Sequence, residues 1–186
     1  IICSAYEGGG KEIYMNETLK TLKTRRSIRS YKSQQIPKDI LEEILNAGMY
    51  APTGMGMQSP IMIAVQKPEQ VKLLSRLNAQ VMGTSNDPFY GAPTVIVVLA
   101  DKERSTYVED GSLVMGNLMN AAASLGIGSC WIHRAREMFE SSEGKEFLRS
   151  LGVDPERYAG IGNCILGYGS EPGKDKPRKD NYVIWA

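Results

Sequence analysis

Residues 94–100, with the sequence TVIVVLA, constrain the fold of this chain more than any other segment. A strand with one face in water alternates apolar and polar side chains, whereas an unbroken β-branched run is typical of a strand covered on both faces. The run is also far too short to cross a membrane. It therefore predicts an inner strand of a sheet that has other elements packed against both of its faces.

Helical and strand-like patterns surround this run in an irregular order. Helices are expected over 16–25, from Pro37, from Pro68, over 110–125 and over 137–151, and short buried strands over 61–65, 129–132 and 158–166. Residues 27–36 fit an extended arm, and residues 83–91 fit a mobile surface loop. The helix over 110–125 is the most apolar and is expected to be central and buried. This mixture predicts an α+β fold with one sheet flanked by helices.

The composition limits the classes of function. The chain has 186 residues, of which 42% are hydrophobic and 23% charged, as in an ordinary soluble globular protein. Its net charge of +1 gives no general attraction to nucleic acid or to an acidic membrane. Cys3, Cys130 and Cys164 are too few and too far apart for a disulfide framework or a zinc site, so a reducing cytoplasm fits best.

The two ends of the chain differ from its middle. Residues 1–14 lack the pattern of a signal peptide and include three consecutive glycines, so we expect a tag or a disordered leader there. No repeat or linker interrupts residues 15–186, which predicts a single domain. The arm over 170–186 ends in the apolar residues Tyr182, Val183, Ile184 and Trp185. Such an arm is expected to dock on something outside its own domain, such as a second subunit.

Two basic clusters are candidates for phosphate binding. Residues 25–29, with the sequence RRSIR, place three guanidinium groups and a hydroxyl together, and a guanidinium matches phosphate oxygens with a planar fork of donors. The alternative is that Arg25 and Arg26 only complement a helix C-terminus. The second cluster comprises Lys174, Lys176, Arg178 and Lys179, for which the alternative is a solubilising tail. Both clusters can converge on one phosphate if the chain ends meet.

The loop over 51–60 is a candidate for binding a flat heterocycle. Gly54 and Gly56 allow the backbone to approach a ligand closely and to expose its N–H groups. Gln58 can both donate and accept at a heterocycle edge, and Met55 and Met57 offer polarizable apolar contact. The alternative is an ordinary turn between a helix and a strand.

The sequence lacks the residue sets of the common catalytic sites. Its one histidine, His133, fits a structural or surface residue better than a lone catalyst, so no Ser-His-Asp set is predicted, and no cluster of metal ligands is present. Gly160 and Gly162 lie inside a strand-like run and do not open a helix, so they are not a nucleotide-binding fingerprint. Cys130 and Cys164 fit inert small hydrophobes. We therefore expect no catalytic side chain and no metal, and a bound cofactor carries the reaction.

Four segments in order resemble the FMN-dependent nitroreductase family. They are residues 25–31 (RRSIRSY), 51–58 (APTGMGMQ), 126–132 (GIGSCWI), and 166–169 (LGYG) followed by 176–179 (KPRK). The resemblance covers roughly residues 16–183. It implies an α+β fold with a central mixed β-sheet flanked by helices, a buried central helix, and an intertwined homodimer with exchange of the C-terminal arm.

The resemblance also implies a site for FMN. Arg25, Ser27 and Arg29 would hold the phosphate and ribityl chain, with Lys176 and Arg178 closing on the phosphate. Arg26 would lie beside the isoalloxazine or contact it through the backbone, Asn78 would meet its pyrimidine edge, and Trp131, Ile132 and His133 would line the ring. Pro52, Thr53 and Gly54 would approach from the other subunit, with Gln58 in the same loop.

The implied activity is a ping-pong transfer of hydride from NADH or NADPH through the flavin to nitroaromatics, quinones or similar small acceptors. Two departures from the family pattern lie in the loop, at Gly56 and at Ser59–Pro60. Alternatives on the same scaffold are reductive dehalogenation and flavin fragmentation. A non-catalytic FMN-binding or sensing protein is a further alternative, whereas the near-neutral charge disfavours nucleic-acid binding.

Overall fold

The computed structural model describes residues 16–186, so the leader expected at 1–14 and Cys3 lie outside the described residues. Four strands form one sheet in the order β1 (Pro60–Val65), β2 (Thr94–Asp101), β4 (Tyr158–Gly167) and β3 (Gly128–Ile132). Every neighbouring pair is antiparallel, so the prediction of a mixed sheet is wrong for these four strands. Within the described part, parallel pairing is confined to one bridge between Ser27 and Ser129.

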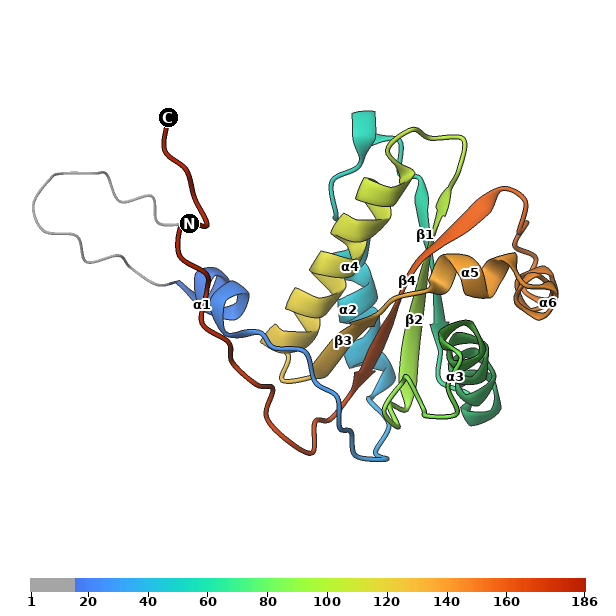
Figure 1. The fold of residues 1–186 in the computed structure, drawn as a ribbon, viewed down its shortest axis with the longest axis horizontal. Helices are drawn as coiled ribbons and strands as arrows, with labels where there is room; N and C mark the ends of the chain where they lie inside the picture. Colours follow the sequence, from blue (N-terminus) through green and yellow to red (C-terminus); the bar gives the residue numbers. More distant parts are fainter. Residues whose placement is uncertain (1–15) are drawn as a thin grey trace, which may run out of the picture.

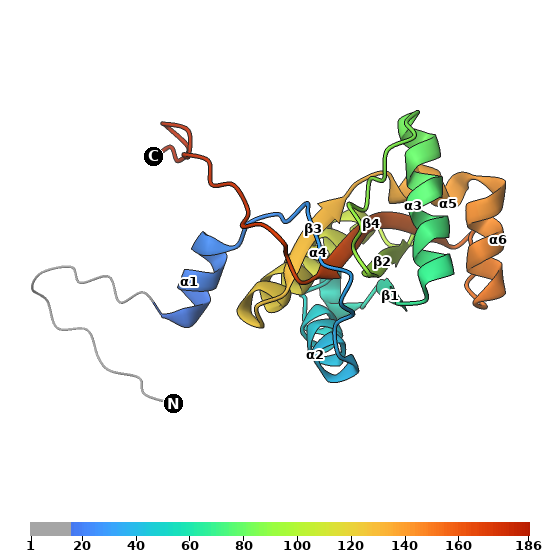
Figure 2. The same cartoon turned by 90° about the horizontal axis from the view of Figure 1, so that it is seen from below.

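The helical connections explain the antiparallel order. α3 (Pro68–Met82) joins β1 to β2 and runs across the strands, since it is seen nearly end-on in Figure 1 and from the side in Figure 2. A parallel neighbour needs a crossover that carries the chain back along the length of the sheet. Because α3 does not carry the chain back along the sheet, β2 begins at the end of the sheet where β1 finishes and runs antiparallel to it.

Helices cover both faces of the sheet (Figure 1). α2 (Lys38–Met49) and α4 (Tyr107–Ser124) pack on one face, and α3, α5 (Ala135–Glu140) and α6 (Ser142–Ser150) pack on the other. The odd-numbered side chains from 95 to 99 join the core beside α3, and the even-numbered ones from 96 to 100 join the core beside α4. All six are 0% exposed, which confirms the inner strand expected from the sequence.

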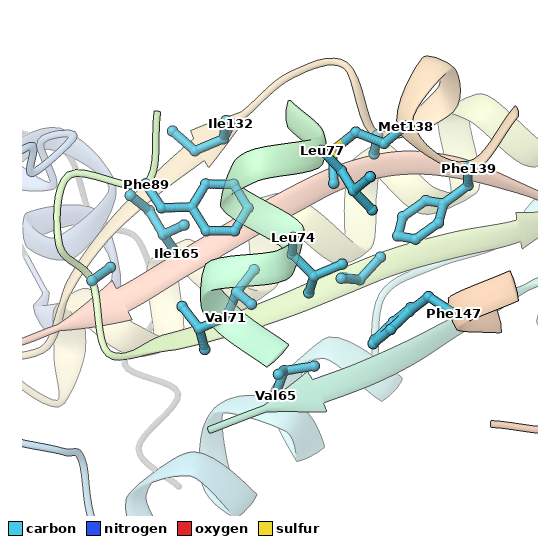
Figure 3. Close-up of a cluster of buried hydrophobic side chains, with 14 of the residues drawn as sticks. Val65, Val71, Leu74, Leu77, Phe89, Ile132, Met138, Phe139, Phe147 and Ile165 are labelled. Atoms are coloured by element: carbon cyan, nitrogen blue, oxygen red, sulfur yellow. The ribbon is translucent and has the colours of Figure 1, made fainter. Parts of the chain in front are cut away.

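The core beside α3 includes a side chain from the loop that the sequence assigned to the surface. Figure 3 shows Phe89 among the side chains of α3 and the sheet, and its ring is 1% exposed. Asp87 closes the turn before it by accepting hydrogen bonds from the backbone N–H groups of Phe89 (2.8 Å) and Gly91 (2.7 Å). The segment 83–91 is therefore anchored in the core and is not simply a surface loop.

Three other features differ from the sequence prediction. α4 begins at Tyr107, three residues before the expected start, and β1 is a half-buried edge strand. The helix expected over 137–151 is two helices, because Ser141 interrupts it with extended backbone. The Ser141 hydroxyl donates to the carbonyl of Met138 (2.6 Å) and accepts from the N–H of Gly144 (3.1 Å), which ends α5 and caps α6.

The two ends of the described chain extend from the same side of the sheet (Figures 1 and 2). α1 (Glu17–Thr24) is capped by Asn16, whose side chain accepts a hydrogen bond from the N–H of Leu19 (2.9 Å), as the sequence predicted. No residue of α1 is buried. The arm after residue 169 forms no helix or strand, and its last apolar side chains are exposed.

Candidate functional site

The arm after α1 runs along the edge of the sheet and joins the beginning of the C-terminal arm. Ser27 pairs with Ser129 of β3, and the N–H of Ile28 donates to the carbonyl of Ser129 (3.0 Å). Tyr31 pairs with Gly169, just beyond β4. The sequence motifs at 25–31, 126–132 and 166–169 therefore meet at one edge, as the resemblance implied.

Arg26 connects the two ends of the chain. Its Nη2 forms an ion pair with Asp175 (2.5 Å), and its Nη1 donates to the carbonyl of Lys23 (2.7 Å). Gly173 lies so close that a Cβ on it would overlap the Cβ of Arg26. The hydrogen bond from Arg26 holds the pKa of the Asp175 carboxyl below its ordinary value. The arm that follows α1 and the C-terminal arm therefore do meet, but the residue that contacts Arg26 is the acidic Asp175 and not a second basic residue.

Lys176 and Arg178 occupy exposed positions on the same arm. The guanidinium of Arg178 donates to the carbonyl of Lys176 (3.2 Å). Neither residue lines the hollow that lies beside Arg26, and Arg29 is also exposed. Within one chain, Arg25 and Arg26 line this hollow, Ser27 pairs with β3 without lining it, and the three cations Arg29, Lys176 and Arg178 stay at the surface.

A hollow of about 420 Å³ lies between the arm, the start of β3 and the C-terminal arm. Its lining includes Arg25, Arg26 and Ser129. Arg25 Nη1, Arg26 Nε and Ser129 Oγ are buried and have no hydrogen-bond partner among residues 16–186. Buried donors without partners are costly, so walls of this kind suit a ligand that supplies several acceptor oxygens. A phosphate group has this chemistry.

A second hollow, of about 320 Å³, lies between α4 and the turn that joins β3 to α5. Trp131, His133 and Arg134 line it. The Nε1 of Trp131 is buried without a partner in the described part of the chain. A Cβ on Gly162 would lie 2.6 Å from this nitrogen, so the glycine leaves room for the indole against β4. Ile132 points to the opposite core and does not line this hollow.

Asn78 holds the turn beside this second hollow. It is 0% exposed, its Nδ2 donates to the carbonyl of His133 (2.7 Å), and its Oδ1 accepts from Nε of Arg134 (3.2 Å). Arg134 has left-handed backbone, with φ of 75°, which is uncommon for a residue other than glycine. Sequence reasoning did not include Arg134, because this turn carries no motif of its own.

The loop with Pro52, Thr53, Gly54 and Gln58 lies at the other end of α4 from the Arg25 hollow (Figure 1). α4 has 18 residues and so spans about 27 Å. Within one chain, these residues are therefore remote from the basic residues. η1 (Gly54–Gly56) is anchored to α4, since the N–H of Gly54 donates to Asp110 (2.8 Å).

Metal ligands, membrane spans and thiols are the remaining features of the described residues. Among residues 16–186, no group of three or more His, Cys, Asp or Glu side chains is arranged to hold a metal ion. No helix in the same range is long and apolar enough to cross a membrane. Cys130 and Cys164 are free and buried, and burial raises the pKa of the Cys164 thiol to about 12.

Comparisons with known proteins agree with this arrangement. The model of the nitroreductase family matches residues 22–85 and 62–169. An Archaeoglobus fulgidus relative described as a NADH dehydrogenase/NAD(P)H nitroreductase is 35% identical, over 90% of this chain and 91% of the relative.

Solved structures show the same likeness. A Bacteroides fragilis nitroreductase with bound FMN aligns with a TM-score of 0.85 and 31% identity, over 92% of this chain and all of that one. A Desulfitobacterium hafniense nitroreductase with bound FMN aligns with a TM-score of 0.83 and 27% identity, over 92% and 99%. The chain belongs to the nitroreductase family.

Proposed function

We propose that this protein binds FMN and transfers hydride from NADH or NADPH, through the flavin, to small oxidised acceptors such as nitroaromatics or quinones. The observation that carries the proposal is the Arg25 hollow, in which three buried donors lack partners among the described residues. Bound FMN supplies the chemistry by accepting hydride from the nicotinamide and passing it on. The protein supplies charge, orientation and exclusion of water.

The residues around the two hollows have separate parts in this proposal. Arg25 and Ser27 hold the phosphate and the ribityl chain, and the exposed Arg29 joins them. Lys176 and Arg178 lie on the arm that Arg26 anchors through Asp175, and they are proposed to close on the same phosphate. Positive charge near a flavin favours its electron-rich reduced form.

The ring is proposed to lie beside the turn after β3. Trp131 and His133 line the second hollow with an indole and an imidazole ring, and Ile132 supports the strand from the opposite core. Both polar atoms of the Asn78 side chain are bonded within the turn, so a contact with the pyrimidine edge requires one of them to change partner. That contact stays a prediction. Asn78 at least fixes the backbone on which His133 is presented. No side chain is required as an acid or a base.

We further propose a homodimer in which the C-terminal arms are exchanged, built from single domains over 15–186. α1 buries none of its residues within its own chain. The exposed fractions of Tyr182, Val183, Ile184 and Trp185 are 71%, 60%, 89% and 91%. Apolar side chains on an extended arm are stabilised only if a partner covers them. A partner would also supply Pro52, Thr53, Gly54 and Gln58, which lie far from the Arg25 hollow in one chain.

The visible spectrum of the purified protein tests the proposal first. We expect flavin absorption that bleaches on addition of NADH or NADPH and returns when a quinone or a nitroaromatic is added. Continued oxidation of NAD(P)H with excess acceptor indicates an enzyme, whereas a single stoichiometric reduction would indicate a storage or sensing protein. A colourless protein that cannot be reconstituted with FMN would refute flavin binding altogether.

A further inference from the structure

The loop over 53–59 has an unusual backbone for its composition. Met55, Gly56 and Gln58 all have positive φ, at 51°, 68° and 50°. Left-handed backbone is uncommon for methionine and glutamine and persists only when the surroundings impose it. Apolar burial does not impose it, because the side chains of residues 55–58 are exposed and Met55 is 93% exposed.

A single buried carboxylate holds both ends of this loop. Asp110, in the first turn of α4, is 2% exposed. Its Oδ1 accepts from the N–H of Gly54 (2.8 Å), and its Oδ2 accepts from the hydroxyls of Ser59 (2.6 Å) and Thr106 (3.3 Å). The N-terminal end of a helix also favours a negative charge. The carboxylate therefore has three donors and a favourable field, which together offset its burial.

Close packing fixes where the loop meets the helix. A Cβ on Gly54 would overlap the Oγ1 of Thr106. The Gly54 backbone thus rests directly on the residue that precedes α4, and its N–H faces Asp110. Any side chain at position 54 would lift the loop away from the carboxylate.

We propose that Asp110 is a positioning residue for the flavin site: it holds the 53–59 loop in the strained shape that completes the site of a second copy of this chain. The inference rests on the proposed function for the role of the loop. The hydrogen bonds that Asp110 accepts from Gly54 and Ser59, called the clamp from here on, are independent of that function. It extends the proposed site to a helix residue that touches neither cofactor nor acceptor.

The clamp is tested without any cofactor. Asp110→Asn keeps the shape of the side chain but replaces one acceptor oxygen with a donor amide. Amide hydrogen exchange of the hydrogen-bonded amides within residues 51–60 should become at least about tenfold faster, the lower end of the range for loss of one hydrogen bond to a charged group. Glu109→Gln is the matched control, because it neutralises the adjacent exposed carboxylate in the same turn. Equal exchange in wild type and Asp110→Asn overturns the clamp.

Ser59→Ala provides a second variant if Asp110→Asn does not fold. It removes one donor and leaves the carboxylate in place, so a smaller increase in exchange of the same loop is expected. Unchanged exchange in this variant would also contradict the clamp.

Mixed dimers test whether the clamped loop serves the other subunit. Asp110→Asn and Arg25→Ala chains carrying different tags are co-expressed, and the dimer with one chain of each is isolated. If the loop acts across the interface, one of the two sites has both an intact Arg25 and a clamped loop. Bound FMN per dimer, and turnover at low acceptor concentration, should then recover to about half of wild type, above both parent variants.

If the loop acts within its own chain, both sites of the mixed dimer are defective and no recovery occurs, which overturns the trans role. A wild-type protein that binds no FMN would refute the proposed function instead. In that case the hydrogen-exchange result still tests whether Asp110 holds the 53–59 loop.

Discussion

Replacing Arg25 with alanine is the sharpest test of the phosphate site. Arg25 is half-buried and lines the hollow, and its Nη1 has no partner among the described residues. A hydrogen bond to a charged group contributes about 1.5–3 kcal/mol. This range corresponds to an increase of about 10- to 150-fold in the Kd for FMN.

Three other variants test how much of this loss comes from charge and how much from the position and shape of the Arg25 side chain. Arg178→Ala removes an exposed cation, and exposed ion pairs contribute about 0.2–1 kcal/mol, so its Kd should rise by less than about fivefold. Lys23→Ala removes an exposed cation in the last turn of α1 and should change the Kd by less than about twofold at physiological salt. Arg25→Lys, which keeps the charge but loses the planar fork, should fall between wild type and Arg25→Ala.

The assay is titration of the apoprotein with FMN, followed by isothermal calorimetry. The absorption spectrum of the flavin that remains bound should stay close to that of wild type, because Arg25 is proposed to bind the phosphate and not the ring. The reasoning is refuted if Arg25→Ala binds FMN within threefold of wild type. It is also refuted if Lys23→Ala and Arg25→Ala lose affinity equally, since net charge would then explain both.

Three further predictions follow from the packing and the ionisable groups. Gly160→Ala should lower the free energy of unfolding in urea by about 1–3 kcal/mol, because its Cβ would overlap the carbonyl of the first residue of α5. Gly116→Ala is the control: its Cβ would have open space, so it should lower the free energy of unfolding by less or raise it. Burial raises the pKa of the Cys164 thiol to about 12, so iodoacetamide at pH 8 should label it only in denaturant, and its contribution to stability should be lost as the pH rises above about 9. Asp175→Asn should release the C-terminal arm at neutral pH, which the amide chemical shifts of that arm would report. In wild type, Arg26 lowers the pKa of Asp175, so the same change in chemical shifts should appear only as the pH falls below about 4.

Periodicity in the sequence predicted the layers of the fold but not the direction of its strands. The run at 94–100 and the apolar stripe of α4 each report which side chains are buried, and both predictions are confirmed. Strand direction depends on how α3 crosses the sheet, and no local pattern records that crossing. The break at Ser141 was missed for a similar reason, because one hydroxyl that bonds at both ends of a turn leaves the apolar spacing intact.

The meeting of distant segments was predictable where side-chain chemistry was concentrated in short motifs. The basic residues at 25–29 and the edge of β3 do meet, as the resemblance implied. Asn78 illustrates the opposite case. The resemblance implied a contact between its amide and the flavin, which stays a prediction. In the structure that amide bonds to the His133 carbonyl and to Arg134, more than fifty residues away, and no local pattern indicates these partners.

Asp110 carried a signal in the sequence that has a physical meaning. It lies four residues before Val114 and eight before Leu118, and thus on the buried stripe of the most apolar helix. A carboxylate at such a position must find donors, because burial without them is far more costly than any helix preference. The helix pattern therefore implies that Asp110 has a polar partner, but it does not identify which residue that partner is. The partners are a backbone N–H at Gly54 and a hydroxyl at Ser59, groups that almost any loop possesses, so only the fold could identify the segment that Asp110 holds.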